Sequence, residues 1–142
     1  TDGGLTWNFL QIPTPEGVII TEYETPMCSF EQPQVFSDTA MSVLADCARE
    51  DANAWYLMTT ADGGLTWLAS LLPVEFLWRT TQLIMATPER GWVRGLTPEN
   101  HAVFTVYETL DGGKTWEQVA AQPDQTGWAF SDDGVVIPLY GR

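Results

Sequence analysis

Short apolar runs, bounded by residues that favour turns, recur along the chain. The runs 54–59 (AWYLMT) and 102–107 (AVFTVY) contain the β-branched and aromatic residues that strands prefer. Each run is followed within a few residues by Asp-Gly-Gly, a signal for a tight hairpin. An apolar segment that ends at a proline follows every such turn, in 8–13, 68–73 and 117–123. The pattern predicts antiparallel β-hairpins built on the Asp-Gly-Gly turns.

The turns belong to a seven-residue motif that occurs three times, as residues 1–7 (TDGGLTW), 61–67 (ADGGLTW) and 110–116 (LDGGKTW). Asp2 and Asp62 are 60 residues apart, whereas Asp62 and Asp111 are 49 residues apart. The shorter spacing fits one four-stranded propeller blade, because blade repeats run about 40–50 residues. The longer spacing leaves room for an inserted loop.

Each motif position has a local physical role. The glycines adopt positive φ at little steric cost, and the aspartate accepts backbone N–H bonds across the turn. The threonine hydroxyls add local bonds, and the tryptophan begins the outgoing strand with a large apolar face. We therefore expect structural roles for Asp2, Gly4, Thr6, Trp7, Thr60, Asp62, Gly64, Thr66, Trp67, Thr109, Asp111, Gly113, Thr115 and Trp116.

The pattern Thr-x-Asp-Gly-Gly-x-Thr-Trp resembles the Asp-box, or BNR, repeat of sialidases, sortilin-type receptors and photosystem II assembly factors. The resemblance implies an all-β fold of antiparallel four-stranded β-propeller blades, in which the Asp-box hairpin joins the third and fourth strands. It also implies that residues 82–95 form the first hairpin of one repeat, and that 34–38 form the matching strand one repeat earlier. Ligands of such propellers bind near the central channel, so the Asp-box aspartates are expected to be turn scaffold.

This interpretation divides the chain into five parts. We expect the last strand of a preceding blade in 1–13, an inserted loop in 14–33, blades in 34–73 and 80–123, and the opening hairpin of a next blade in 127–142. Two whole blades fall short of the four to eight that close a propeller. The sequence therefore predicts a partial propeller, a fragment that further blades of a longer chain or other copies would complete.

Charge excludes some classes of partner. Six Lys and Arg stand against 19 Asp and Glu, for a net charge of -13. A nucleic-acid groove needs clustered cations, so nucleic acid is excluded as a partner, and an anionic membrane surface is disfavoured. The longest apolar stretch, 67–78, is interrupted by Pro73 and Glu75 and is too short to insert into a membrane. The seven Trp and the 44% apolar content still indicate a folded chain.

The two cysteines, Cys28 and Cys47, lie 19 positions apart without a CxxC pair or a histidine-rich partner. A zinc site is therefore disfavoured, and we expect no metal and no cofactor. Two alternatives stay open, a disulfide and two free core thiols. A disulfide would indicate an oxidising compartment, which is the basis for expecting an extracellular or cell-envelope location.

No catalytic residue is predicted. The sialidases resembled through the motif use an arginine cluster, a Tyr–Glu nucleophile pair and an Asp acid, and no Arg-Ile-Pro signature occurs here. The only histidine, His101, lies in a loop by composition, and nothing around it indicates a triad. The arginines are Arg49, Arg79, Arg90, Arg94 and Arg142. Arg79, which follows Trp78, and the pair Arg90 and Arg94 are expected to form salt bridges and to pack through their stems, although a contact surface for an anionic group or a partner is an alternative.

The expected function is therefore non-enzymatic: a propeller segment that binds a protein or glycan partner, with its binding residues unknown. Two alternatives stay open. One is a fragment of a sialidase-like or other glycoside hydrolase, and the other is an assembly factor of a membrane complex. Nineteen acids supply carboxylate candidates for a glycosidase pair but identify none.

Overall fold

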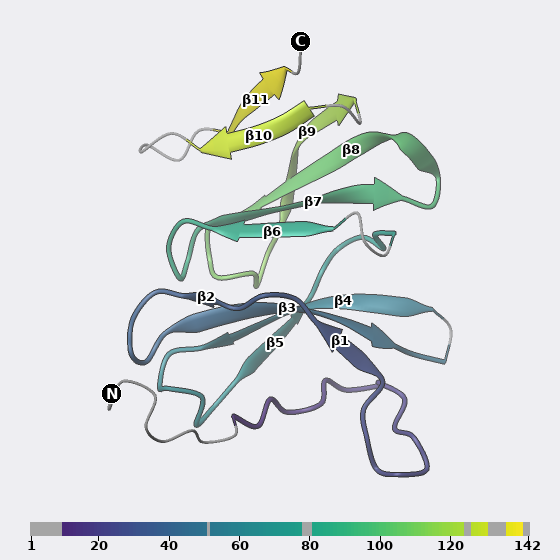
Figure 1. The fold of residues 1–142 in the computed structure, drawn as a ribbon, viewed down its shortest axis with the longest axis vertical. Helices are drawn as coiled ribbons and strands as arrows, with labels where there is room; N and C mark the ends of the chain where they lie inside the picture. Colours follow the sequence, from purple (N-terminus) through teal and green to yellow (C-terminus); the bar gives the residue numbers. More distant parts are fainter. Residues whose placement is uncertain (1–9, 51, 78–80, 124–125, 131–135, 141–142) are drawn as a thin grey trace.

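The computed structural model describes residues 10–50, 52–77, 81–123, 126–130 and 136–140, and in this part of the chain it is all-β, without a helix. Two antiparallel sheets stack on each other, and a two-stranded hairpin follows them (Figure 1). The first sheet holds β1 (Cys28–Phe30), β2 (Gln34–Val35), β3 (Met41–Ala48), β4 (Asn53–Thr60) and β5 (Leu68–Leu71). The second holds β6 (Gln82–Met85), β7 (Gly91–Thr97), β8 (Asn100–Thr109) and β9 (Glu117–Pro123). The hairpin is β10 (Thr126–Phe130) with β11 (Val136–Tyr140).

The two sheets have the same strand order and connectivity. In the first, β3, β4 and β5 follow one another across the sheet, as β7, β8 and β9 do in the second. The first position is taken by β6 in one sheet and by β1 together with β2 in the other. Both β1 and β2 pair with β3, so the five-stranded sheet has the same four positions as the four-stranded one.

The break between β1 and β2 has a local cause. Three residues, 31–33, stand opposite the two residues of β3 that separate its pairings with β1 and β2. Glu31 still donates its N–H to the Leu44 carbonyl at 2.9 Å, but Pro33 has no N–H to donate. The edge strand therefore carries a bulge at 31–33.

The predicted inserted loop, 14–33, is more ordered than expected. Its last part forms β1, and isolated bridges join Val18 to Arg49 and Ile20 to Pro26. Sequence reasoning missed β1 because its three residues, CSF, are too few to show a period. The first sheet thus begins at Cys28 rather than at residue 34.

The last strand expected in 8–12 is absent from residues 10–12, which form no strand, and residues 1–9 lie outside the described part of the chain. The first copy of the motif, Asp2, Gly4, Thr6 and Trp7, therefore lies outside the described residues. The expected hairpin in 127–142 is present as β10 and β11, which pair in register from Thr126 with Tyr140 to Phe130 with Val136.

The main core lies between the two sheets. Leu44, Trp55 and Leu57 of the first sheet pack with Met85 and Val93 of the second. The connection from β5 to β6 adds two more buried side chains, Leu72 and Phe76. This apolar contact explains why the sheets stack face to face, since each sheet buries one of its faces against the other.

The opposite face of the first sheet is also buried. Val43, Ala45 and Met58 form a second cluster with Val18 of the N-terminal segment, beside Cys47 and Tyr56. Consecutive residues of β4 thus face two cores, which explains the continuous apolar run in place of a polar alternation. Cys28 and Cys47 form a disulfide between directly paired residues of β1 and β3, so the disulfide alternative is confirmed.

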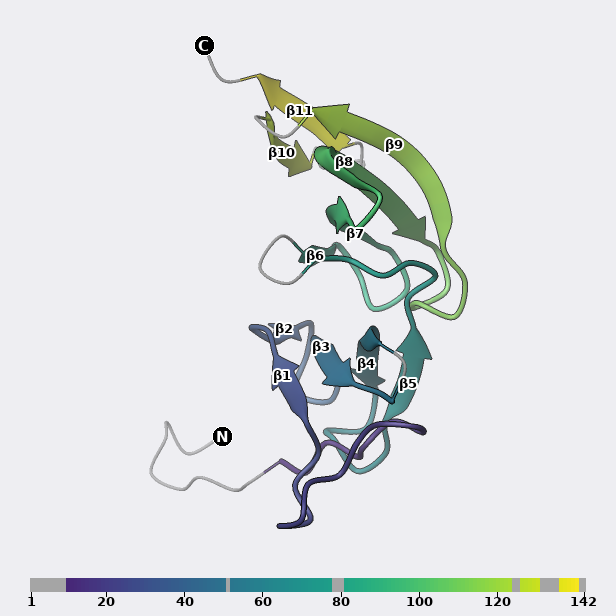
Figure 2. The same cartoon turned by 90° about the vertical axis from the view of Figure 1, so that its right-hand side faces the viewer.

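Seen from the side, the sheets and the hairpin follow one another in a curved row (Figure 2). Within the described residues this row does not close into a ring. In the same part of the chain no helix is long and apolar enough to span a membrane.

Candidate functional site

The second and third copies of the motif form two turns with the same hydrogen bonds. In the second copy, Asp62 Oδ1 accepts the Thr66 N–H and the Thr60 hydroxyl, both at 2.9 Å. Asp62 Oδ2 accepts the Thr66 hydroxyl at 2.6 Å, and Thr60 Oγ1 accepts the Gly64 N–H at 2.9 Å. The third copy repeats these four bonds, among Thr109, Asp111, Gly113 and Thr115, to within 0.1 Å.

Each turn connects the third and fourth positions of its sheet, β4 to β5 and β8 to β9. Both glycines of each turn have positive φ, with 74° and 87° at Gly63 and Gly64 and nearly the same angles at Gly112 and Gly113. This backbone is what glycine permits and other residues resist. The repeat is therefore one of conformation as well as of sequence.

A second repeat was missed by sequence reasoning. The N–H of Gly63 donates to the Thr39 carbonyl at 2.8 Å, and that of Gly112 donates to the Glu89 carbonyl at 2.7 Å. The acceptors lie in the hairpin turns 37–40 and 87–90, where Ser37 and Thr87 each cap two following N–H groups. The available signal was a hydroxyl residue 25 positions before Asp62 and 24 positions before Asp111.

The turn hydrogen bonds also set the acidity of the motif aspartates. The Thr66 hydroxyl and N–H stabilise the ionised form and lower the pKa of Asp62 from 3.8 to about 2, and Thr115 lowers the pKa of Asp111 to the same value. Both carboxylates are therefore ionised at neutral pH and held in place as acceptors, which suits a scaffold rather than an acid catalyst.

We expect Asp62→Asn to lower the melting temperature at pH 7, because the amide cannot replace both charged acceptor oxygens. A depressed pKa contributes stability that is complete above the unfolded value of 3.8 and is lost as the pH falls toward 2. The difference from wild type should therefore shrink between pH 4 and pH 2 in thermal melts followed by circular dichroism. Asp38→Asn, an exposed carboxylate in the neighbouring turn, is the control. A gap that stays constant with pH would contradict this role.

The tryptophans are mostly packing groups. Trp116 of the third copy packs against the core between the sheets, and Trp67 of the second packs against the core on the opposite face of the first sheet. Trp55 and Trp92 are both 2% exposed, and the Trp55 indole donates to the Phe76 carbonyl at 2.9 Å. The side chains of Trp7, Trp78 and Trp128 lie outside the described part.

The cations of the second sheet have internal partners. Arg90 forms an ion pair with Glu108 at 2.9 Å and lies over the Trp92 ring. Arg94 donates to Gln82 at 2.9 Å and lies over the Phe104 ring. These contacts favour salt bridging and stem packing over an anion-binding surface. Arg79 and Arg142 lie outside the described residues.

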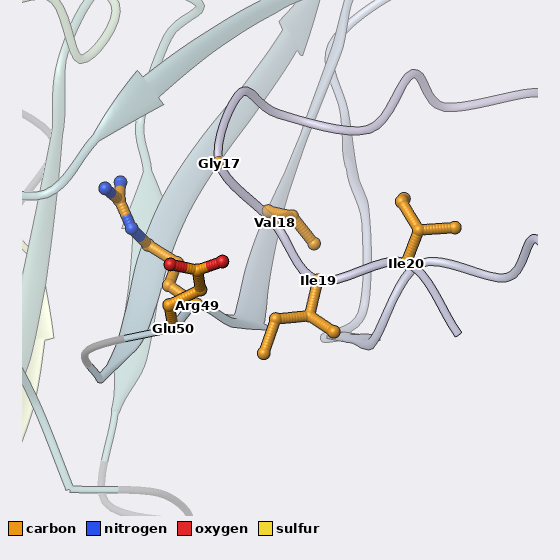
Figure 3. A pocket seen from close by; sticks show the side chains of 6 residues that line it. All are labelled: Gly17, Val18, Ile19, Ile20, Arg49 and Glu50. Atoms are coloured by element: carbon orange, nitrogen blue, oxygen red, sulfur yellow. The ribbon is translucent and has the colours of Figure 1, made fainter. Parts of the chain in front are cut away.

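A pocket of about 730 Å³ lies beside the N-terminal segment (Figure 3). Val18, Ile19 and Ile20 line it together with Arg49 and Glu50. The guanidinium points away from the two isoleucines in Figure 3, and its Nη1 donates to the Tyr56 hydroxyl at 3.1 Å. The Tyr56 hydroxyl in turn donates to the Glu16 carbonyl at 3.4 Å, so the arginine and the tyrosine together link the N-terminal segment to the sheet. The Glu50 carboxylate is the second charged group in the lining.

A groove of about 460 Å³ runs between the first positions of the two sheets. Gln34 spans it: its amide nitrogen donates to the Leu83 carbonyl, and its Oε1 accepts the Met85 N–H, both at 2.7 Å. The side-chain amide thereby pairs with the edge of β6 as a peptide group would. This contact fixes the distance between the sheets at their edges.

One buried carboxylate has an oxygen without a hydrogen-bond donor within the described part of the chain. Asp46 in β3 is 8% exposed, and its Oδ1 has no hydrogen-bond partner among the described residues. Burial raises its pKa above 3.8, a hydrogen bond from Asn53 opposes this, and the nearby charges of Glu31 and Glu75 raise it further. Asp46 lines a pocket of about 440 Å³, and sequence reasoning did not separate it from the other acids.

We expect Asp46→Asn to raise the melting temperature at pH 7, because it removes a buried charge and keeps the side-chain shape. A raised pKa means that the folded state is penalised as the pH rises above the unfolded value of 3.8. The gain should therefore be present at pH 7 and small at pH 3, where wild type is protonated. The opposite pattern, with a loss at both pH values, would show that the ionised carboxylate stabilises the fold.

The described residues hold no group of three or more His, Cys, Asp or Glu side chains that could bind a metal ion. His101 is exposed at the start of β8 rather than in a loop, because the strand begins at Asn100.

Comparisons of the chain with protein-family models, with curated proteins and with solved structures return no match. Its function must therefore be inferred from the repeated turns and from the chemistry of its pockets.

Proposed function

We propose that each sheet is one blade of an Asp-box β-propeller, and that this propeller is a non-catalytic module for binding a protein or glycan. The observation that carries the proposal is the identity of the two motif turns. Each has the same four hydrogen bonds and the same pair of positive-φ glycines, and each joins the third and fourth positions of its sheet.

The packing supports the same proposal. Blades of a propeller stack face to face around an axis, and the two sheets bury Leu57 and Val93 against each other. Since four to eight blades close a ring, further blades from the same longer chain or from other copies would complete it. The β10–β11 hairpin would be the first half of a third blade.

The binding role is supported by how the polar groups of the described part are used. The motif aspartates are occupied by turn bonds, and Arg90 and Arg94 are engaged within the second sheet. These residues therefore fit structural roles better than a glycosidase site, which needs two carboxylates at one cleft. The disulfide fits an extracellular or cell-envelope location, where such bonds persist.

The test uses the longest natural chain that contains these residues. A propeller predicts a compact, disc-like particle by small-angle scattering, whereas an open stack of sheets would give an elongated one and would overturn the blade assignment. A non-catalytic module predicts no hydrolysis of a sialoside or β-glucan reporter. Turnover that is lost on replacing channel-facing carboxylates would instead establish a glycoside hydrolase.

A further inference from the structure

The pocket that Asp46 lines has one charged wall and several apolar ones. Ser29 is the direct ladder partner of Asp46, and Ala48 lies two positions further along β3, so their side chains share one face of the sheet. Met27 and Asn53 stand beside Ala48, to which Met27 is hydrogen-bonded and Asn53 is paired. The alternation of side chains therefore places the Asp46 carboxylate on the face that carries this pocket.

The charge at this place is only partly compensated, by one hydrogen bond from the Asn53 side chain. Asp46 is 8% exposed, Oδ1 has no hydrogen-bond partner in the described part of the chain, and Glu31 and Glu75 add negative charge nearby. A buried carboxylate is costly unless a cation or several donors meet it. A metal ion would need further ligands, and no such group exists among the described residues. The complementary ligand is therefore an organic cation.

We propose that this pocket binds a lysine or arginine side chain of a partner protein, with Asp46 as its anionic partner. The inference rests on the binding role proposed above and names the chemistry of the partner. Pro26, Met27 and Ala48 supply apolar walls for the methylene stem of such a side chain. Ser29 and Asn53 add polar atoms at the head group. An amino sugar would carry the same charge, but it presents a ring of hydroxyl groups where these walls are apolar.

The test is an NMR titration of the ¹⁵N-labelled chain, held oxidised, with N-acetyl-arginine methylamide as the probe. N-acetyl-citrulline methylamide, which has the same shape without the charge, is the matched ligand control, and glucosamine tests the sugar source. We expect saturable shifts of the Asp46 amide and the Asn53 side-chain amide with the arginine probe. Binding of a single side chain should be weak, with Kd on the order of millimolar.

Two isosteric variants test whether the charge of Asp46 binds the arginine probe. Asp46→Asn and Asp38→Asn change the net charge equally, but Asp38 is exposed in the 37–40 turn, away from the pocket. We expect Asp46→Asn to weaken binding about tenfold or more, and Asp38→Asn to leave it unchanged. Thermal melts and dispersed amide spectra check that both variants fold.

Three results would overturn the proposal: no saturable shifts at Asp46 and Asn53, equal binding of the citrulline probe, or equal loss in both variants. Tighter binding of glucosamine than of the arginine probe would assign the site to a sugar instead. None of these outcomes bears on the particle shape or on the hydrolase assay, so failure here is distinguishable from failure of the proposed propeller function.

Discussion

Gly113→Ala is expected to destabilise the protein by about 2–4 kcal/mol. Gly113 has a φ of 88°, and a methyl group there would lie 2.5 Å from Leu57 Cδ2 in the neighbouring sheet. Leu57 is 0% exposed in the core between the sheets, so it has no free space in which to move. Urea denaturation of the oxidised protein should show a lower midpoint at an unchanged slope.

Gly63→Ala separates the two causes of this loss of stability, the left-handed backbone and the clash with a packed side chain. Its φ is 74°, but the nearest atom to an added methyl is the Asp38 carbonyl oxygen at 3.8 Å, an ordinary contact. We expect only the cost of the left-handed backbone, about 1–2 kcal/mol. In a Leu57→Ala background, the loss of stability caused by Gly113→Ala should decrease to the same value of about 1–2 kcal/mol, the cost of the left-handed backbone alone, because the clashing side chain is gone. Equal losses for both glycine variants in wild type would refute a packing role of the third motif against the first sheet.

Removing the disulfide is the second large effect. Cys28 and Cys47 are 19 positions apart, and a crosslink of that span contributes about 3 kcal/mol. Because β1 has three residues and sits at the edge of the sheet, we expect its attachment to be lost before that of β3 and β4. Hydrogen exchange of the Cys28→Ala, Cys47→Ala double variant should show lost protection at Glu31 and Ala48, whose N–H groups donate to the Leu44 and Met27 carbonyls across this edge. Protection should be kept at Leu44 and Leu57.

Reduced wild type is the control for the alanine variant, since both lack the crosslink but only one lacks the sulfur atoms. The paired serine variant should be less stable than the paired alanine variant, because Cys47 is 0% exposed among apolar side chains and a hydroxyl there would be poorly satisfied. Two free thiols on titration of the oxidised protein under denaturing conditions would contradict the bond itself.

The hairpins were predictable because their causes are local. Asp62 and Thr66 are four residues apart and bond to each other directly, so the motif carries its turn with it. The apolar runs of β4 and β8 were predictable for the same reason, since strand preference and the following turn agree. The bulged edge at 31–33 was not, because it depends on how residues 31–33 meet β3.

The sequence by itself determined the repeated turn and the all-β character, because these follow from neighbouring residues. The tertiary structure decided which groups meet across long separations. It placed Leu57 against Gly113, joined Gln34 to the edge of β6 and formed the disulfide in preference to two thiols. It also singled out Asp46 among the acids of the described residues, since burial depends on what packs around a side chain and not on the residues beside it in the chain.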